Sequence, residues 1–339
     1  MLPDSARELK ALLSERLSEA PRGTVLSRSV DAEAFATGGA TRWTGVALGL
    51  TPVGPGSVHL AIRLVDEADA ETVLSGLDEA ARAEVDVRVI GRVRPQSQPA
   101  PGWSPEELQQ RVRPLRPGLS ISHPDVTAGT LGGFVRYPGA GGLLVLSNNH
   151  VLAASDAATE GDAALQPGVA DGGTPADRIG ALTAFVRLTP EPGNLVDAAV
   201  AALDDGVDAD PAAYPGGPLA GLVAGVDDVD PDELVEKLGR TTGHTRGRIT
   251  AVEVDGVGVQ YDEGVVTFDD QVEVEGLTGG FSAGGDSGSV IWRSRDRAPL
   301  GLLFAGSTTG GSAGGGVTFA NPLATVLREL GLEWVSTSG

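Results

Sequence analysis

The chain has 339 residues, no cysteine and a formal net charge of -21 at pH 7. Without cysteine, disulfides and thiolate metal sites are excluded, and four scattered histidines argue against a multi-histidine metal site. The acidic charge argues against nucleic acid or an anionic membrane as a partner. With 49 glycines and 4% aromatic residues, the composition favours a turn-rich β protein with cores of Val, Leu, Ile and Ala.

The first hundred residues predict a small α+β unit. Leucines at three- and four-residue steps predict a helix over 4–20. Two strands over 44–50 and 57–65 follow, joined by a turn rich in proline and glycine. Helical spacing over 68–83 and a strand over 85–90 complete the order α-β-β-α-β, which makes a unit of domain size. This unit offers no catalytic set of residues, so we expect it to serve recognition or regulation.

The N-terminus is charged and polar and has no apolar signal core. No run of about 18 apolar residues occurs, so no membrane-spanning helix is expected. A cytoplasmic protein is the simplest expectation. The sequence leaves open whether the chain self-associates or has a regulatory protein partner.

The remaining chain divides into a linker and a β-rich domain. Prolines mark residues 101–118 as a linker, so residues 1–100 and 119–339 are expected to be separate domains. After residue 119, short apolar runs broken roughly every 8–12 residues by Gly, Pro and Asp are typical of a barrel or sandwich. Near the end, Asn321-Pro322 precedes an apolar stripe, which predicts a final helix with Asn321 as its N-cap.

The most informative motif is Gly285-Asp286-Ser287-Gly288-Ser289. Its glycines allow a tight turn around Ser287, and the amides of Gly285 and Ser287 could then point at one spot where a tetrahedral oxyanion would sit. Serine alone is a poor nucleophile, so this interpretation needs a base and an orienting carboxylate elsewhere in the chain.

Both partners occur upstream. His150 follows the stretch Leu146-Ser147-Asn148-Asn149, and Asp197 lies in an apolar stretch where a carboxylate needs a partner. Asp204, Asp205 and Asp208 are competitors, but they lie in an acidic loop bounded by Gly and Pro. The chain order His…Asp…Ser differs from the order of α/β hydrolases and from that of subtilisins.

These segments resemble the trypsin/chymotrypsin-like serine protease superfamily. The resemblance covers about residues 119–335 and implies a mostly β, chymotrypsin-like double β-barrel preceded by the small α+β domain. More narrowly, the chain resembles cysteine-free bacterial proteases related to the plant narrow-leaf proteins. That likeness rests on Gly129–Val135, on the Ser-Asn-Asn-His segment and on Gly239–Gly247.

The resemblance also implies the substrate site. Phe281 would give the primary specificity pocket an apolar or blocked floor rather than an acidic one, and an extended substrate would pair along Phe304, Ala305 and Gly306. In activated relatives the residue at Asp286 binds a newly cut N-terminus. No such cleavage site is evident near residue 119, so Asp286 is expected to pair with an arginine or with backbone amides, and the protease could await a partner or a cleavage.

The sequence therefore predicts a serine endopeptidase with His150, Asp197 and Ser287 as its catalytic triad, acting on a protein or peptide and needing no cofactor. Three alternatives stay open. The chain could be a catalytically silent binding or scaffold protein, an esterase, or an effector protease, for example in defence, that acts on one partner protein.

Overall fold

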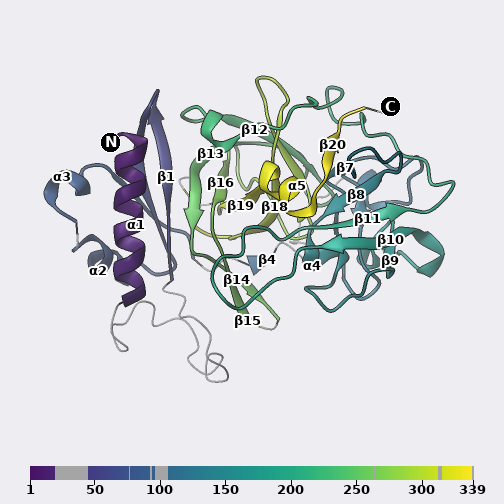
Figure 1. The fold of residues 1–339 in the computed structure, drawn as a ribbon, viewed down its shortest axis with the longest axis horizontal. Coiled ribbons are helices and arrows are strands. Elements are labelled where there is room, and N and C mark those ends of the chain that lie inside the picture. Colours follow the sequence, from purple (N-terminus) through teal and green to yellow (C-terminus); the bar gives the residue numbers. More distant parts are fainter. Residues whose placement is uncertain are drawn as a thin grey trace.

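The computed structural model describes residues 1–19, 45–75, 77–91, 94–95, 106–262, 264–311 and 315–337. Three parts follow one another along its longest axis (Figure 1). The N-terminal unit lies at one end, the barrel that contains β12 to β19 lies in the middle, and the sheet that contains β7 to β11 lies at the other end.

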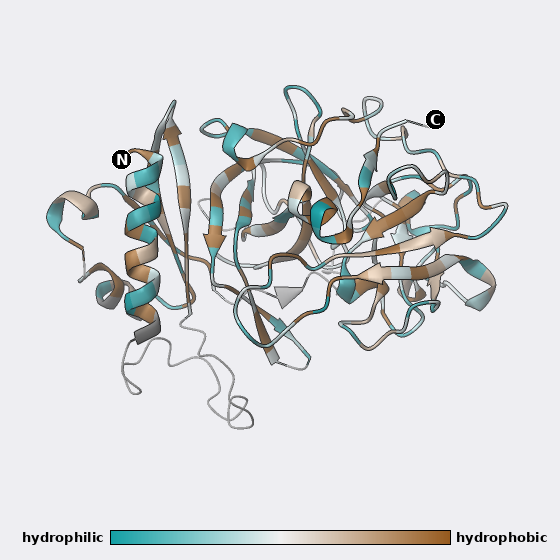
Figure 2. Ribbon diagram, in the orientation of Figure 1, coloured by the Kyte–Doolittle hydropathy of each residue, from teal (hydrophilic) through white to brown (hydrophobic). Residues whose placement is uncertain are grey.

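The N-terminal unit matches the predicted helix and strands. Helix α1 (Pro3–Glu19) packs on a sheet formed by β1 (Val46–Gly54), β2 (Ser57–Leu64) and β3 (Val85–Val89). β1 and β2 form an antiparallel hairpin, and β3 returns parallel to β2. The helix buries Ala6 and Leu13, and hydrophilic and hydrophobic residues alternate along it (Figure 2).

The predicted helical stretch over 68–83 is broken into short pieces. These are η1 (Glu67–Asp69), α2 (Ala70–Leu74) and α3 (Glu79–Arg82). The break arises because Asp78 caps a new helix: its side chain accepts a 2.8 Å hydrogen bond from the amide of Ala81.

The middle part is a closed antiparallel barrel. Its strands are β12 (Leu234–Gly239), β17 (Val290–Arg293), β18 (Pro299–Gly306), β19 (Thr318–Pro322), β16 (Gln271–Gly276) and β13 (Gly243–Asp255). They pair in that order, and β13 pairs back with β12, which closes the ring. Every residue of β18 is buried, which explains why its sequence is a continuous apolar run rather than an alternating one. A hairpin of β14 (Val257–Tyr261) and β15 (Gly264–Phe268) flanks the barrel.

The other part is a six-stranded antiparallel sheet. Its strands, in spatial order, are β20 (Glu333–Val335), β7 (Gly133–Arg136), β8 (Leu144–Ser147), β11 (Ala199–Leu203), β10 (Arg178–Phe185) and β9 (Ala163–Leu165). The short pair β5 (Ser120–Ile121) and β6 (Gly129–Thr130) is linked to β9 by a bridge between Ser122 and Leu165. Short helices α4 (Asn149–Leu152), η3 (Val169–Asp171), η4 (Pro175–Asp177) and η5 (Val226–Asp228) lie in its loops and those of the barrel. The predicted mostly β double barrel is confirmed.

The final helix, α5 (Leu323–Leu330), is present, but its predicted N-cap is wrong. Pro322 is the capping residue and no side chain caps the helix. The Asn321 side chain turns inward, where it accepts a bond from the Asp197 amide and donates one to Gln271. A long-range contact has overridden the local capping preference here.

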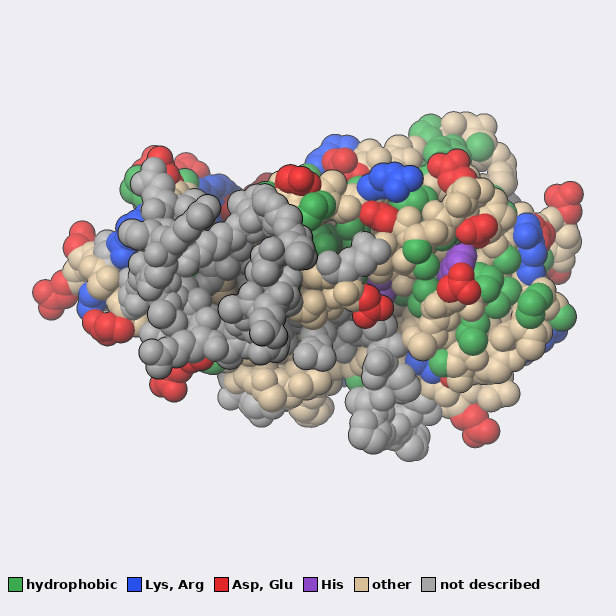
Figure 3. All heavy atoms as spheres, turned by 90° about the horizontal axis from the view of Figure 1, so that it is seen from below, with side chains coloured by type: hydrophobic (Ala, Val, Ile, Leu, Met, Phe, Trp, Pro, Cys, Tyr) green, Lys and Arg blue, Asp and Glu red, His purple; other side chains and the backbone are tan. Residues whose placement is uncertain are grey.

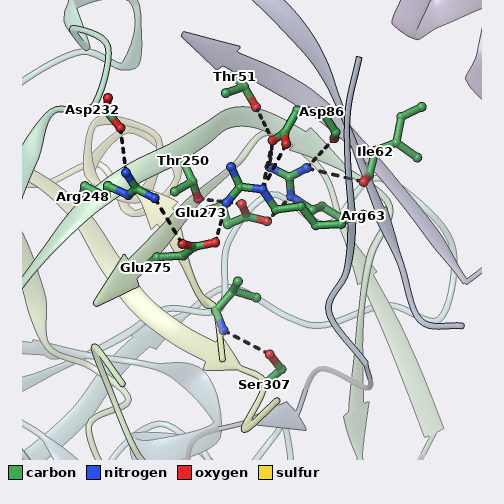
Figure 4. Close-up of polar contacts among 12 residues, drawn as sticks. Thr51, Ile62, Arg63, Asp86, Asp232, Arg248, Thr250, Glu273, Glu275 and Ser307 are labelled. Carbon is green, nitrogen blue, oxygen red and sulfur yellow. Dashed lines mark hydrogen bonds and ion pairs between the residues drawn. The ribbon is translucent and has the colours of Figure 1, made fainter. Parts of the chain in front are cut away.

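The N-terminal unit and the middle barrel share one sheet. β1 pairs with β13, so the barrel sheet continues through β1 and β2 to β3. Buried charges cross this junction (Figure 4). Arg63 of β2 donates to Glu273 of β16 at 2.6 Å and to Asp86 of β3 at 2.9 Å. Arg63 and Glu273 are fully buried, and Thr250 also donates to Glu273. The division into domains at residues 1–100 and 119–339 stays a prediction.

Arg63→Lys is expected to destabilise the protein by about 1–3 kcal/mol, because lysine cannot hold two carboxylates with the fixed fork of a guanidinium. Chemical denaturation with urea measures the change. Arg82→Lys, in the exposed part of the N-terminal unit, is the matched control and should change the free energy of unfolding by less than about 0.5 kcal/mol. Equal effects of both substitutions would contradict this role for Arg63.

Part of the predicted linker is packed. η2 (Glu106–Gln109) begins the described portion after residue 105, and Leu108, Leu115 and Leu119 are buried in the same hydrophobic cluster as β7 and β8. Before it, the two-residue strand β4 (Arg94–Pro95) pairs with β18.

Among the described helices, none combines the length and apolar character required to cross a bilayer. On the face seen in Figure 3, acidic side chains outnumber basic ones, in keeping with the net charge of -21.

Candidate active site

Strand pairing brings His150 and Asp197 together. β8 and β11 are antiparallel, and Ser147 lies opposite Ala199. His150 comes three residues after Ser147, in α4, and Asp197 comes two residues before Ala199, so both lie at the same end of this strand pair. The imidazole Nδ1 is 2.6 Å from Asp197 Oδ2, and the His150 amide donates to Asp197 Oδ1 at 3.2 Å.

Several groups hold the Asp197 peptide and carboxylate in place. Asn148 donates to the Asp197 carbonyl at 2.7 Å, and the Asp197 amide donates to Asn321 at 3.0 Å. The Tyr261 hydroxyl, from β14, donates to Asp197 Oδ2 at 2.6 Å. Complete burial by itself would raise the pKa of Asp197, but the interactions with His150 and the Tyr261 hydroxyl outweigh it, so that pKa is lowered. Burial and the adjacent carboxylate raise the pKa of Tyr261 well above its ordinary value.

Tyr261→Phe is expected to lower the stability by about 1.5–3 kcal/mol at neutral pH, because it removes a hydrogen bond to a buried charge. A lowered carboxyl pKa contributes stability above the unfolded value of about 3.9, and this contribution is lost as pH falls through the folded value. Without Tyr261 the folded pKa of Asp197 rises toward 3.9. The acid-unfolding midpoint, followed by circular dichroism, should therefore move to higher pH.

The matched control for that experiment is Tyr137→Phe, since Tyr137 directly follows β7 and is 36% exposed. It should leave the acid midpoint unchanged. An unchanged midpoint in Tyr261→Phe would contradict the proposed hydrogen bond to Asp197.

The Ser287 turn is held from the opposite sheet. The Thr130 amide donates to the Ser287 carbonyl at 2.7 Å, and the Thr130 hydroxyl donates to the Gly285 carbonyl at 2.9 Å. Gly288 has φ = +94°, and a Cβ there would lie 2.1 Å from the Ser147 hydroxyl. Only glycine fits this position. The turn is therefore pressed against the end of β8, near the segment that carries His150.

Asp286 is fully buried and has no unpaired oxygen. Its Oδ1 accepts from the amides of Thr241 and Thr242, and its Oδ2 accepts from Ala283 and from the Thr242 hydroxyl. Lys237 of β12, also fully buried, lies 3.2 Å from Oδ2. Burial lowers the pKa of Lys237, although the Asp286 charge opposes the shift. Asp286 thus pairs with backbone amides, as expected, and with a lysine instead of an arginine.

This network fixes the peptide planes on both sides of Asp286. Among the described residues, neither the Gly285 amide nor the Ser287 amide has a hydrogen-bond acceptor. Gly285 has φ = +93°, and a Cβ there would lie 2.3 Å from the Arg240 guanidinium. Within the described part of the chain, both amides therefore keep their hydrogen-bonding capacity unused.

The structure does not join Ser287 to His150 by a hydrogen bond. The Ser287 hydroxyl donates to the Phe304 carbonyl at 3.3 Å, and the buried Nε2 of His150 has no partner among the described residues. The two segments are nonetheless neighbours. A Cβ on Gly129 would lie 2.4 Å from Val151, which follows His150, and 3.0 Å from the Ser287 carbonyl. Catalytic hydrogen bonds are often long or misaligned in the absence of substrate.

The other predicted site residues lie close to the same turn. Phe304, Ala305 and Gly306 end β18, and the Ser287 hydroxyl bonds to the first of them. Phe281 is 2% exposed and packs in the core of the middle barrel, with the Lys237 ammonium 5.8 Å from its ring centre. Its role as a pocket floor stays a prediction.

Two residues of the Gly239–Gly247 segment have partners of their own. Arg240 is buried and pairs with Asp171 at 2.6 Å. His244 lies 2.5 Å from Glu236 and stacks on the Trp292 ring. Burial of Glu236 opposes ionisation, but the His244 contact outweighs it and the pKa of Glu236 is lowered.

The sequence interpretation missed Lys237, Tyr261 and Thr130. One signal pointed to Lys237: it is one of only two lysines in the chain, and it interrupts the apolar run of β12. No local pattern distinguishes Tyr261 or Thr130, because their partners are distant in sequence.

No family model and no curated protein match this sequence. Solved structures resemble it. A glutamic-acid-specific serine protease is 21% identical, with 65% of this chain and 100% of that chain covered and a TM-score of 0.46. A Nocardiopsis protease is 20% identical (66% and 100% covered, TM-score 0.46), and Thermobifida fusca protease A is 19% identical (66% and 100% covered, TM-score 0.44).

Proposed function

We propose that this chain is a serine endopeptidase that hydrolyses peptide bonds through an acyl-enzyme on Ser287. The observation that carries the proposal is the 2.6 Å contact between His150 Nδ1 and a fully buried carboxylate, Asp197, beside a glycine-bounded serine turn. An imidazole held in this way keeps its proton on Nδ1 and leaves Nε2 free to accept another. That Nε2 is the atom without a partner among the described residues.

In the proposed mechanism, the Ser287 hydroxyl turns from the Phe304 carbonyl toward His150 Nε2. Ser287 Oγ attacks the carbonyl carbon of the substrate, and His150 takes the hydroxyl proton and later gives it to the leaving amine. Asp197 holds the imidazole orientation and stabilises the imidazolium. The oxyanion forms where the Gly285 and Ser287 amides converge, and the loss of one such donor generally raises the barrier by about 2.7–4 kcal/mol.

The pairing of Asp286 with Lys237 supports a preformed oxyanion site. In this chain the buried lysine supplies the positive charge that a newly cut N-terminus supplies in activated members of the superfamily. We therefore expect no cleavage to be needed for the shape of the turn itself. A protein or peptide is the expected substrate, and the chemistry requires no cofactor.

A fluorophosphonate probe tests the proposal, because it modifies only a serine whose hydroxyl is activated. The site of labelling is mapped by mass spectrometry in the wild type, in Ser287→Ala and in Ser289→Ala. Ser289 is the matched control, a buried serine of the same turn whose hydroxyl donates to the Asp286 carbonyl. We expect labelling at Ser287 in the wild type and in Ser289→Ala, and none in Ser287→Ala.

The alternative functions differ in which substrate, if any, the protein hydrolyses. A silent scaffold protein would fold normally and take up no label. An esterase would take up label and hydrolyse esters but not peptides. An effector protease would take up label and cut a single protein, which profiling of cleaved termini in whole-cell extracts distinguishes from a general endopeptidase.

A further inference from the structure

Strand β4, which precedes the predicted linker, lies on the edge of β18 that faces the Ser287 turn. Pro95 lies opposite Ala305 and Arg94 lies opposite Gly306, in antiparallel register. These are two of the three residues along which an extended substrate is expected to pair. The identity of that edge as a substrate site rests on the proposed function.

Pairing of the neighbouring strands establishes which edge this is. On one side, β18 pairs with β19 as far as Gly306. On the other side, β17 pairs only as far as Leu302, after which the Ser287 turn takes over: the Gly288 amide donates to the Leu303 carbonyl. Since β19 fills one edge of Ala305 and Gly306, β4 fills the edge that continues from the Ser287 turn.

The chain is anchored immediately before it reaches this edge. Ile90, which follows β3, is 4% exposed and packs in one cluster with Phe304 and Ala305. Its amide donates to the Leu64 carbonyl at 2.8 Å. A Cβ on Gly310 would lie 2.6 Å from the Val89 carbonyl, so the loop after β18 closes tightly over the end of β3. The end of β3 therefore lies next to the last residues of β18 and the loop that follows them.

The direction of β4 is that of a bound peptide. From Arg94 to Pro95 the chain advances from Gly306 toward Phe304, whose carbonyl accepts from the Ser287 hydroxyl. Proline has no backbone donor, so only Arg94 can donate from this pairing. Main-chain pairing of this kind is how extended peptides add to a sheet edge.

We infer that β4 occupies the edge of β18 to which a substrate would pair, and that the N-terminal unit inhibits the protease in cis through this strand. A tethered strand competes at a millimolar effective concentration, which is enough to exclude substrates of ordinary affinity. In this state the residues of the proposed active site are in place, but β4 occupies the strand edge to which a substrate would pair.

The test uses the full chain and measures binding separately from catalysis. In a Ser287→Ala background, a fluorescein-labelled peptide with the sequence of residues 89–98 is titrated by anisotropy against the parent, Arg94→Pro and Arg94→Ala. Arg94→Pro removes the one backbone donor, whereas Arg94→Ala keeps it and is the matched control. We expect about ten-fold tighter binding or more for Arg94→Pro, and parental affinity for Arg94→Ala. Unchanged melting temperatures verify that each variant folds.

The second readout is hydrolysis of a peptide library by the Arg94→Pro and Arg94→Ala variants, with Ser287 intact. If Arg94→Pro binds the peptide more tightly but no variant hydrolyses peptides, the occupied edge is supported and the proposed function fails. If all variants bind the peptide equally, inhibition in cis is overturned, whether or not they hydrolyse peptides. If Arg94→Ala bound the peptide as tightly as Arg94→Pro, the inference would also be overturned, because loss of the backbone hydrogen bond would then not be the cause of the tighter binding.

Discussion

Asp197→Asn is expected to lower kcat/KM for peptide hydrolysis about 10⁴-fold. The amide group of asparagine can present a donor to His150 Nδ1 where the carboxylate now accepts at 2.6 Å. The imidazole would then place its proton on Nε2, the atom that must accept the proton of Ser287. The proposed nucleophile and the proposed oxyanion amides stay in place, so binding of a peptide aldehyde or other reversible ligand should weaken far less than turnover.

The matched control is Asp204→Asn. Asp204 is a competitor for the same role in the sequence, and it is ion-paired on the surface with Arg178 at 2.8 Å. Surface pairs contribute little, so we expect kcat/KM to change less than about two-fold. A comparable loss in both variants, or retained turnover in Asp197→Asn, would contradict the assignment of Asp197.

Lys237→Met is expected to destabilise the protein by about 3–5 kcal/mol, because it leaves the carboxylate of Asp286 buried without its counter-charge. It should also lower kcat more than it raises KM. Asp286 orients the peptides that carry the two proposed oxyanion amides, and such amides are expected to act on the transition state rather than on bound substrate. Urea denaturation and steady-state kinetics measure the two effects.

The control for Lys237 is Lys10→Met, the other lysine of the chain, which lies in α1 and pairs with Asp255 at 2.9 Å. It should destabilise the protein less than Lys237→Met does, because Asp255 is 33% exposed whereas Asp286 is fully buried. The double variant Lys237→Met/Asp286→Asn removes both charges. Its loss of unfolding free energy should therefore be smaller than the sum of the losses in the two single variants. Additive losses would show that the two residues do not interact.

The sequence predicted the catalytic candidates because each lies in a short motif with its own signature. Ser287 lies between two glycines of a tight turn, His150 directly follows a strand, and Asp197 is a charge within an apolar stretch. Their chain order then distinguished a double barrel from other hydrolase folds. The strand pairing of β8 with β11 shows the physical basis: it brings His150 and Asp197 to one end of the same sheet.

The remaining features depend on contacts between distant segments. Asn321 precedes a proline and a helix, so its local pattern indicates a cap, yet its side chain bonds to the Asp197 amide. Tyr261 reaches Asp197 from the β14 hairpin, whose placement no local pattern specifies. Arg94-Pro95 is indistinguishable from a linker in sequence, because two residues with one backbone donor carry no strand signal.

The N-terminal unit illustrates the same limit. Its helix and strands follow from the periodicity of apolar residues, but periodicity does not indicate that its sheet continues into β13. The buried pair of Arg63 and Glu273 crosses this junction. Each residue lies in a strand whose sequence otherwise alternates between apolar and polar residues. That junction nevertheless places the end of β3 next to the last residues of β18 and the loop that follows them.

The most direct test of the proposed function is whether Ser287 hydrolyses peptide bonds. A proteome-derived peptide library is incubated with Arg94→Pro, in which we expect the substrate edge to be open, and with Arg94→Pro/Ser287→Ala. New peptide termini are then identified by mass spectrometry. We predict new termini with Arg94→Pro and none when Ser287 is also replaced. The same termini in both samples, or none in either from protein that is folded, would contradict a catalytic role for Ser287.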